Sequence, residues 1–223
     1  MTLDEVMTQL EAWGTEKARE INGKNGAGEN QFGVNLSNLR ALAKQIKSNH
    51  DLALQLWETG NVEAILLATL IVKPKLLSAD DLDEMMATLT YFKTTDWFVG
   101  NVVQNNPHKI ELGEKWRTSS DEYFRRAGWS LLTEQILKGS GVDLSATLDI
   151  IEAELKDAPY RTQESMNHTL VEIGIHSPEH RARAIAIGEK LGVFKDYPVP
   201  KGCTSPYAPI WIAYFVDRQT GVN

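Results

Sequence analysis

The chain has 223 residues, of which 42% are hydrophobic and 24% charged, a composition typical of a globular protein large enough to bury a core. Its net charge of −7 and pI near 5.3 argue against a general nucleic-acid binder, because non-specific affinity for phosphates comes from lysine and arginine. The single cysteine, Cys203, excludes an intrachain disulfide and a cysteine-cluster metal site.

The sequence contains no apolar run of about eighteen residues, so no membrane span is expected. Its first residues lack the basic start and apolar block of a signal peptide. We therefore expect a cytoplasmic protein that has no membrane partner.

Apolar residues recur at helical spacing along most of the chain. Thr2 with Glu5 has the form of a capping box and predicts a first helix, and residues 22–33 form a glycine-rich loop that matches no phosphate-binding motif. Asp96 is the expected N-cap of the helix that carries Trp97. Ser78 with Asp81 and Ser119 with Glu122 are expected to start the helices that follow them, and Lys73-Pro74 is expected to end a buried helix. Further helices are predicted at 36–46, 52–57, 62–72, 78–92, 96–105, 110–118, 120–138, 144–157, 162–175, 178–191 and, after a proline-rich segment, 210–216.

These helices fall into antiparallel pairs at intervals of roughly 30 to 40 residues. No long segment shows the alternation of apolar and polar residues that a strand would show. The pattern predicts an all-α fold, a curved α-solenoid in which the second helix of each pair lines a concave groove. We expect one repeat domain over residues 1–223, with residues 196–223 packing on its end as a C-terminal cap.

Three of the predicted second helices carry aromatic, amide or basic groups on the face opposite their apolar stripe. These groups are Trp97, Asn101 and Gln104, then Arg126 and Trp129, then Asn167 and His168. Aromatic rings interleaved with arginine suit stacking on bases and contact with phosphates. The alternative is packing against neighbouring helices, with Arg and Trp forming a local cation–π pair.

Residues 177–202 hold five basic and three acidic groups, a small positive patch that an ordinary solvated helix face would also show. His176 and His180 are four residues apart, but Pro178 places a helix start between them, so we expect no metal site.

Three stretches of the sequence carry a family resemblance. They are Leu56-Trp57 with Gly60 and Glu63, the Thr-Thr-Asp-Trp stretch at 94–97, and the run from Trp116 through Ser120 to Arg125, Arg126 and Ala127. Over about residues 30–195, and most specifically at 94–129, the chain resembles the DNA alkylation repair family of AlkD-type glycosylases, which are HEAT-like helical-repeat proteins. Active members excise positively charged 3- and 7-methylpurines. The resemblance implies double-stranded, alkylated DNA as partner, hydrolysis of an N-glycosidic bond, and no metal or organic cofactor.

Within this resemblance, Trp97 matches the family's aromatic on the middle helix and Arg126 matches its phosphate-contacting arginine. Asn101 stands where the family has its catalytic aspartate, and His168 falls where it has a second tryptophan. The catalytic positions are thus Asn101 and Trp97. The expected DNA-binding residues are Arg125, Arg126, Trp129, Asn167, His168 and Gln104.

The aspartate would stabilise the oxocarbenium character that develops on the sugar, by roughly 4 kcal/mol at about 4 Å and an effective dielectric of about 20. Asn101 offers only a dipole, which predicts a rate lower by on the order of a hundred- to a thousandfold. We expect a DNA-binding relative of the enzymes with weak or lost activity. The alternative is a non-catalytic HEAT-like scaffold for a protein or for branched or damaged DNA.

Overall fold

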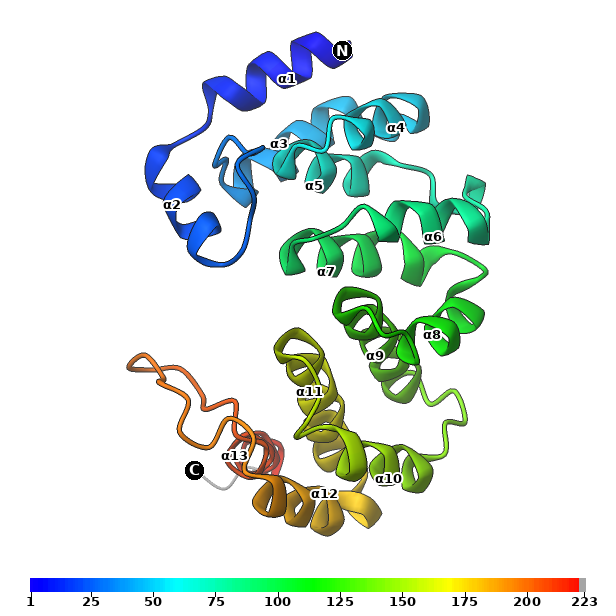
Figure 1. Ribbon diagram of the computed structural model, residues 1–223, viewed down its shortest axis with the longest axis vertical. Helices are drawn as coiled ribbons and strands as arrows, with labels where there is room; N and C mark the ends of the chain where they lie inside the picture. The colour runs from blue at the N-terminus through cyan, green and yellow to red at the C-terminus, as the bar shows by residue number, and fades with distance from the viewer. Residues whose placement is uncertain (221–223) are drawn as a thin grey trace. The chain divides into compact units, whose positions relative to one another are not determined.

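The computed structural model describes residues 1–220, and its side chains are described as far as Arg218. Within residues 1–220 every regular element is helical, as the sequence predicts (Figure 1). The chain folds into two compact units, Met1–Leu112 and Gly113–Asn223. One repeat domain over residues 1–223, with a concave groove, remains a prediction.

The first unit contains seven α-helices and two short 3-10 helices among its described residues. They are α1 (Leu3–Ala12), α2 (Glu16–Lys24), α3 (Leu36–Ile46), α4 (His50–Glu58), α5 (Val62–Ile71), η1 (Pro74–Leu76), α6 (Ala79–Ala87), α7 (Phe92–Asn101) and η2 (Val103–Asn105). Helix α5 is buried on nearly all sides and packs against α3, α4 and α7. It ends just before Pro74, which cannot continue a helix, as predicted.

A buried carboxylate attaches the segment after α2 to α5. Glu63 is 1% exposed and accepts hydrogen bonds from the backbone N–H groups of Phe32 at 2.7 Å, Gly33 at 3.0 Å and Val34 at 3.3 Å. Gly33 has φ +77°, and a Cβ there would lie 2.5 Å from the Thr15 carbonyl oxygen, so only glycine fits. The glycine-rich stretch therefore has a structural role. The loop predicted at 22–33 starts too early, because α2, which was not predicted, extends to Lys24.

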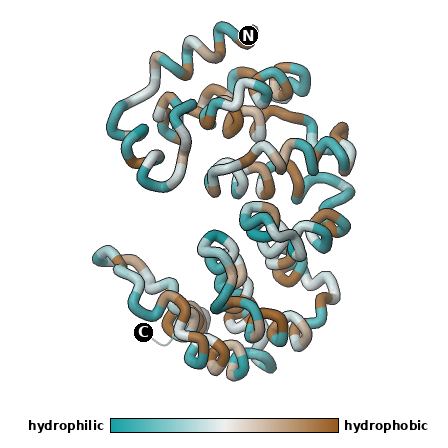
Figure 2. Tube along the Cα trace, in the orientation of Figure 1, coloured by the Kyte–Doolittle hydropathy of each residue, from teal (hydrophilic) through white to brown (hydrophobic). Residues whose placement is uncertain are grey.

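The second unit is organised around α11. The α-helices that follow α7 are α8 (Lys109–Arg117), α9 (Glu122–Leu137), α10 (Leu144–Glu154), α11 (Tyr160–His176), α12 (Pro178–Leu191) and α13 (Ala208–Thr220). Helix α11 packs against α9, α10, α12 and α13. Hydrophobic and hydrophilic residues alternate along these helices, as amphipathic packing requires (Figure 2).

Helix starts were predicted with mixed success. The capping boxes at Thr2 and Ser78 are both formed, and Pro178 occupies the first turn of α12. Asp96 is not an N-cap, because α7 begins at Phe92 and Asp96 lies inside it. Helix α9 is capped by Asp121, whose carboxylate accepts from the backbone N–H groups of residues 123 and 124, and not by the predicted Ser119.

No helix within residues 1–220 is both long and apolar enough to cross a lipid bilayer.

Candidate nucleic-acid interface

In the first unit, α7 presents Trp97 and Asn101 one turn apart on one side of the helix. Trp97 is half-buried, and the guanidinium carbon of Arg40 lies 5.2 Å from the centre of its ring. This cation–π contact joins α3 to α7 and places a positive charge beside an aromatic face. The predicted face of α7 thus gains a basic partner that the sequence analysis did not identify.

Asn101 is held by a hydrogen bond that suits an amide. Its Nδ2 donates to the Oγ1 of Thr69 at 3.3 Å, and that buried hydroxyl donates in turn to the Leu66 carbonyl at 2.7 Å. A carboxylate at position 101 has no proton to donate, and the hydroxyl proton of Thr69 is already committed to the backbone. The local network therefore supports a neutral group at this position.

Gln104 does not extend this face. The helix predicted to continue to residue 105 ends at Asn101, and Gln104 lies in η2. Its backbone carbonyl accepts a hydrogen bond from Lys109 at 3.2 Å. Because the 3-10 turn changes the direction of the side chains, Gln104 leaves the helical register that it was predicted to share with Trp97.

A basic surface lies next to the Arg40–Trp97 contact. Residues 30–50 contain no acidic group, and their three basic residues, Arg40, Lys44 and Lys47, recur on one side of α3 and its C-cap. All three are exposed. The absence of acidic residues over this stretch is the signal that could have identified the surface from the sequence.

The surface continues towards the end of α5. The backbone N–H of Asn49 donates to the Ile71 carbonyl at 2.9 Å, which brings the segment after α3 next to the segment that holds Lys73 and Lys75. Both lysines are exposed. Lys47 has φ +64°, a strained backbone conformation that glycine would relieve. We call Arg40, Lys44, Lys47, Lys73 and Lys75 the basic face of the first unit.

In the second unit, the predicted phosphate-contacting Arg126 is paired within the protein. Its side chain is 12% exposed, and its guanidinium contacts the Glu164 carboxylate at 2.7 Å and the Arg161 carbonyl at 3.0 Å. Arg125 forms an ion pair with Glu154.

Trp129 and Asn167 were predicted to face outwards, and both predictions are wrong. Trp129 is fully buried in the core of the second unit, where the guanidinium carbon of Arg117 lies 5.6 Å from its ring centre. Asn167 is 2% exposed because the chain before α13 covers it, and its Nδ2 donates to the Pro206 carbonyl at 2.9 Å.

His168 is on the outside of α11, as predicted, but it interacts along its own helix. The Nε2 atoms of His168 and His176 lie 3.1 and 3.2 Å from the two oxygens of Glu172. The hydrogen bond from His168 is the main reason that the pKa of Glu172 lies below its ordinary value, although burial opposes this shift. The ring of His168 also lies 5.7 Å from that of Trp211.

The positive patch predicted at 177–202 is largely neutralised or used structurally. Arg181 donates to the last carbonyls of α11, those of residues 174 and 175. Arg183 pairs with Asp149, and Lys190 pairs with Glu152. His180 contacts two serine hydroxyls, whereas His176 contacts Glu172.

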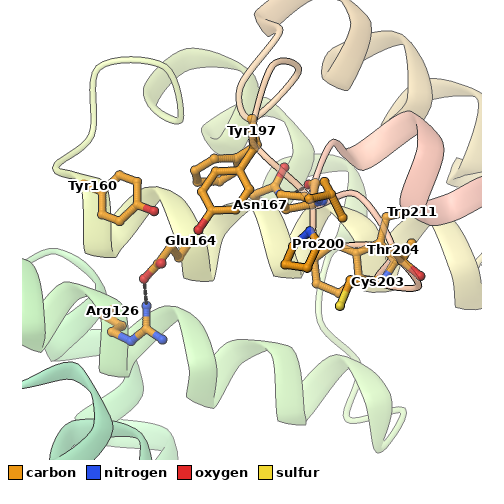
Figure 3. Close-up of a pocket in the computed structure, with 12 residues that line it drawn as sticks. Arg126, Tyr160, Glu164, Asn167, Tyr197, Pro200, Cys203, Thr204 and Trp211 are labelled. Carbon is orange, nitrogen blue, oxygen red and sulfur yellow. Dashed lines mark hydrogen bonds and ion pairs between the residues drawn. The ribbon is translucent and has the colours of Figure 1, made fainter. Parts of the chain in front are cut away.

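A cavity of about 380 Å³ lies between α11 and the C-terminal segment (Figure 3). Arg126, Glu164 and Asn167 line it from the helices, and Tyr197, Cys203 and Trp211 are among the residues that line it from the following chain. The segment predicted as a packing cap therefore encloses space as well as covering α11. We call this space the C-terminal cavity.

Relatives of this chain are known from sequence. The uncharacterised protein Lin0241 of Listeria innocua is 23% identical over the whole of both chains. The uncharacterised protein Lmo0209 of Listeria monocytogenes is 20% identical over 86% of this chain and 87% of its own.

A solved structure matches with a TM-score of 0.84 and 28% identity over 98% of this chain and 95% of the other. That structure represents a new family of proteins related to the HEAT-like repeat DNA glycosylases with affinity for branched DNA structures. The fold of the present chain is accordingly that of the HEAT-like helical-repeat proteins.

The family model described as DNA alkylation repair enzyme matches residues 6–212, nearly the full length of the chain. The family resemblance, expected over about residues 30–195, is confirmed by this match, and the chain belongs to the DNA alkylation repair enzyme family.

Proposed function

We propose that this protein binds branched or damaged DNA and excises alkylated purines weakly or not at all. The observation that carries the proposal is Asn101, a neutral amide held by Thr69 at the position where the family resemblance implies a catalytic carboxylate. A group without charge cannot provide the electrostatic stabilisation that an oxocarbenium-like transition state needs.

The features that would bind DNA are retained in the first unit. Trp97 offers a partly exposed ring, Arg40 lies over it, and the basic face continues to the end of α5. Such a combination of stacking and positive charge suits nucleic-acid backbones and unpaired bases. Affinity for branched DNA in the structurally similar protein supports a branched ligand for this one.

The first test is single-turnover excision with excess protein on duplex DNA that contains 7-methylguanine. We expect release close to the spontaneous rate for the natural chain and a gain of about a hundredfold for Asn101→Asp. Gln55→Glu, on the exposed side of α4, adds the same charge elsewhere and should gain nothing. Rapid release by the natural chain, or no gain in Asn101→Asp, would contradict this account of Asn101.

The second test compares binding to a four-way junction and to linear duplexes of the same arm sequences. We expect tighter binding to the junction and a steep loss of affinity with salt, because phosphate contacts release counterions. Salt-insensitive or absent binding to both DNAs would instead favour the second candidate, a helical scaffold for a protein partner.

A further inference from the structure

Lys93, in the first turn of α7, is a half-buried lysine whose direct partners are neutral. Its Nζ donates a hydrogen bond to the Oδ1 of Asn22 in α2 at 2.9 Å and lies 5.5 Å from the centre of the Tyr91 ring. Asn22 and Tyr91 are both buried. Over the part of the chain whose side chains are described, residues 1–218, no carboxylate forms an ion pair with this amine.

These surroundings lower the pKa of the Lys93 amine below its ordinary value of 10.5. The main cause is burial, which disfavours the charged form, and the attraction of Glu63 in α5 opposes it. The Glu63 carboxylate is already occupied by three backbone N–H groups. A desolvated lysine keeps more of its amine unprotonated near neutral pH, and an unprotonated amine is a nucleophile for carbonyl groups.

Lys93 lies on the side of α7 that carries the candidate DNA-binding residues. Lys93, Trp97 and Asn101 are spaced four residues apart, so they follow one another along one side of the helix. Residues at this spacing have their Cβ atoms about 6 Å apart. Lys93 and Trp97 are both partly exposed. A DNA strand held against the Trp97 ring would therefore have its sugars next to the Lys93 amine.

DNA offers an aldehyde to such an amine only where a base is missing. The sugars of intact DNA are closed rings, whereas the deoxyribose of an abasic site opens to an aldehyde at C1′. The missing base also leaves a gap in the stack, which a flat ring such as that of Trp97 can fill. An abasic site therefore supplies an electrophile for Lys93 and a place for the ring beside it.

We propose that this protein acts on abasic sites in DNA, with Lys93 as the nucleophile. The Lys93 amine adds to C1′ of the opened sugar, and water leaves to form an imine. Loss of the C2′ proton to water then allows the C3′–O3′ bond to break, and its electron pair leaves with the phosphate. Hydrolysis of the imine restores the amine. The inference rests on the proposed function, because DNA must first bind along α7, and the reaction needs no carboxylate at position 101.

Borohydride tests the imine, because reduction converts it into a stable link between protein and DNA. The natural chain should be trapped on a duplex with an abasic site, but not on the same duplex with a tetrahydrofuran site, which has no aldehyde. Lys93→Arg keeps the charge but is not a nucleophile, so trapping and strand cleavage should fall at least about tenfold while the tetrahydrofuran duplex is still bound. Lys93→Gln, which keeps a donor for Asn22, should show the same loss.

The matched control is Lys17→Arg. It makes the same substitution at an exposed lysine of α2, outside the basic face, and should be trapped as the natural chain is. Peptide mass spectrometry of the reduced adduct should locate the DNA on Lys93.

A second experiment measures the amine without DNA. A small aldehyde with cyanoborohydride alkylates unprotonated amines, and peptide mass spectrometry gives the rate at each lysine. Exposed lysines stay protonated until about pH 10, so the rate at Lys93 relative to Lys17 should be several times higher at pH 7 than at pH 10. A ratio that is independent of pH would overturn the inference.

These outcomes separate the inference from the proposed function. Absence of trapping in a chain that binds DNA, or trapping that persists in Lys93→Arg and Lys93→Gln, would overturn the inference and leave the proposed function standing. Binding to no DNA, junctions included, would overturn both.

Discussion

At the residue scale, one buried carboxylate determines how the N-terminal segment is attached. Glu63 satisfies three backbone donors from a segment about thirty residues earlier in the chain. Glu63→Ala leaves these N–H groups without a partner in a buried site, so we expect a loss of about 3 kcal/mol in the free energy of unfolding. Glu58→Ala, on the exposed side of α4, should change it by less than about 0.5 kcal/mol. Urea denaturation measures both values, and equal effects would show that the three hydrogen bonds contribute little.

Arg40 is the residue whose removal should change DNA binding most specifically. Arg40→Ala deletes a positive charge from the basic face and leaves Trp97 without its cation. We expect the slope of log affinity against log salt concentration to become shallower by about one, for junction and duplex alike. Lys138→Ala removes an equal charge that is paired with Glu134 within α9 and should leave the slope unchanged. Titrations at several salt concentrations measure the slope, and an unaltered slope in Arg40→Ala would remove Arg40 from the interface.

Sequence periodicity predicts whether a residue is exposed only where no distant part of the chain covers it. Trp97 and Asn101 share a side of α7 as predicted. Trp129 was placed outside because it is three residues from Arg126, but on a helix that is covered on several sides both positions face neighbours. Asn167 is covered by chain that follows about forty residues later. Helical spacing gives the face of a residue and not the long-range contacts of that face.

At the element scale, two glycines set how closely helices approach. A Cβ at Gly128 of α9 would lie 2.2 Å from the backbone nitrogen of Arg117, whereas at Gly174 of α11 it would meet side-chain atoms, the nearest being Cδ1 of Ile212 at 2.5 Å. We expect Gly128→Ala to destabilise the protein by about 3 kcal/mol and Gly174→Ala by less, since a side chain can move more easily than backbone. Gly100→Ala in α7 meets nothing within 4 Å and should be neutral or stabilise by up to about 1 kcal/mol. Thermal unfolding of the three variants gives the order, and a stable Gly128→Ala would contradict it.

Helix α11 carries a pH-dependent contribution to stability. The folded-state pKa of Glu172 is lowered by the hydrogen bond from His168, so the ionised carboxylate stabilises the fold above its ordinary pKa of 4.5, and this stabilisation is lost as the pH falls through the lowered value. Glu172→Gln should therefore cost about 1 kcal/mol at pH 6 and progressively less below pH 4.5. Glu179→Gln, exposed on α12, should show no such trend. Unfolding curves between pH 6 and pH 3 test this, and a pH-independent difference would contradict it.

The elements themselves were predicted where a local signal fixes them. Capping boxes and the prolines at 74 and 178 set helix boundaries through interactions among residues close in sequence. The boundaries that they predict are present in the structure. Helix α2 was missed because it is short and mostly polar, with little apolar periodicity. The start of α7 at Phe92 was missed because Tyr91 provides no side-chain cap, and Asp96 gave a false signal inside the helix.

At the scale of the whole molecule, charge limits how DNA can bind. The first unit has ten basic and fifteen acidic residues. However, the two segments that carry its basic face, residues 30–50 and 64–79, contain no acidic residue. If about three phosphates contact this face, the slope of log affinity against log salt concentration should be near −3, and affinity should fall roughly fiftyfold between 50 and 200 mM salt. The same titrations test this, and a slope close to zero would exclude phosphate contacts as the basis of binding.

The C-terminal cavity is lined by helices on one side and by the chain after α12 on the other, and this arrangement has a consequence for how such proteins diverge. Its floor belongs to α11, whose residues also form the core, so most substitutions there are selected against for stability. Its cover is exposed chain between α12 and α13, and substitutions there cost little. The shape and chemistry of the cavity can therefore drift among descendants of this chain through the cover alone, while the helices beneath it, and the ancestry they record, stay recognisable.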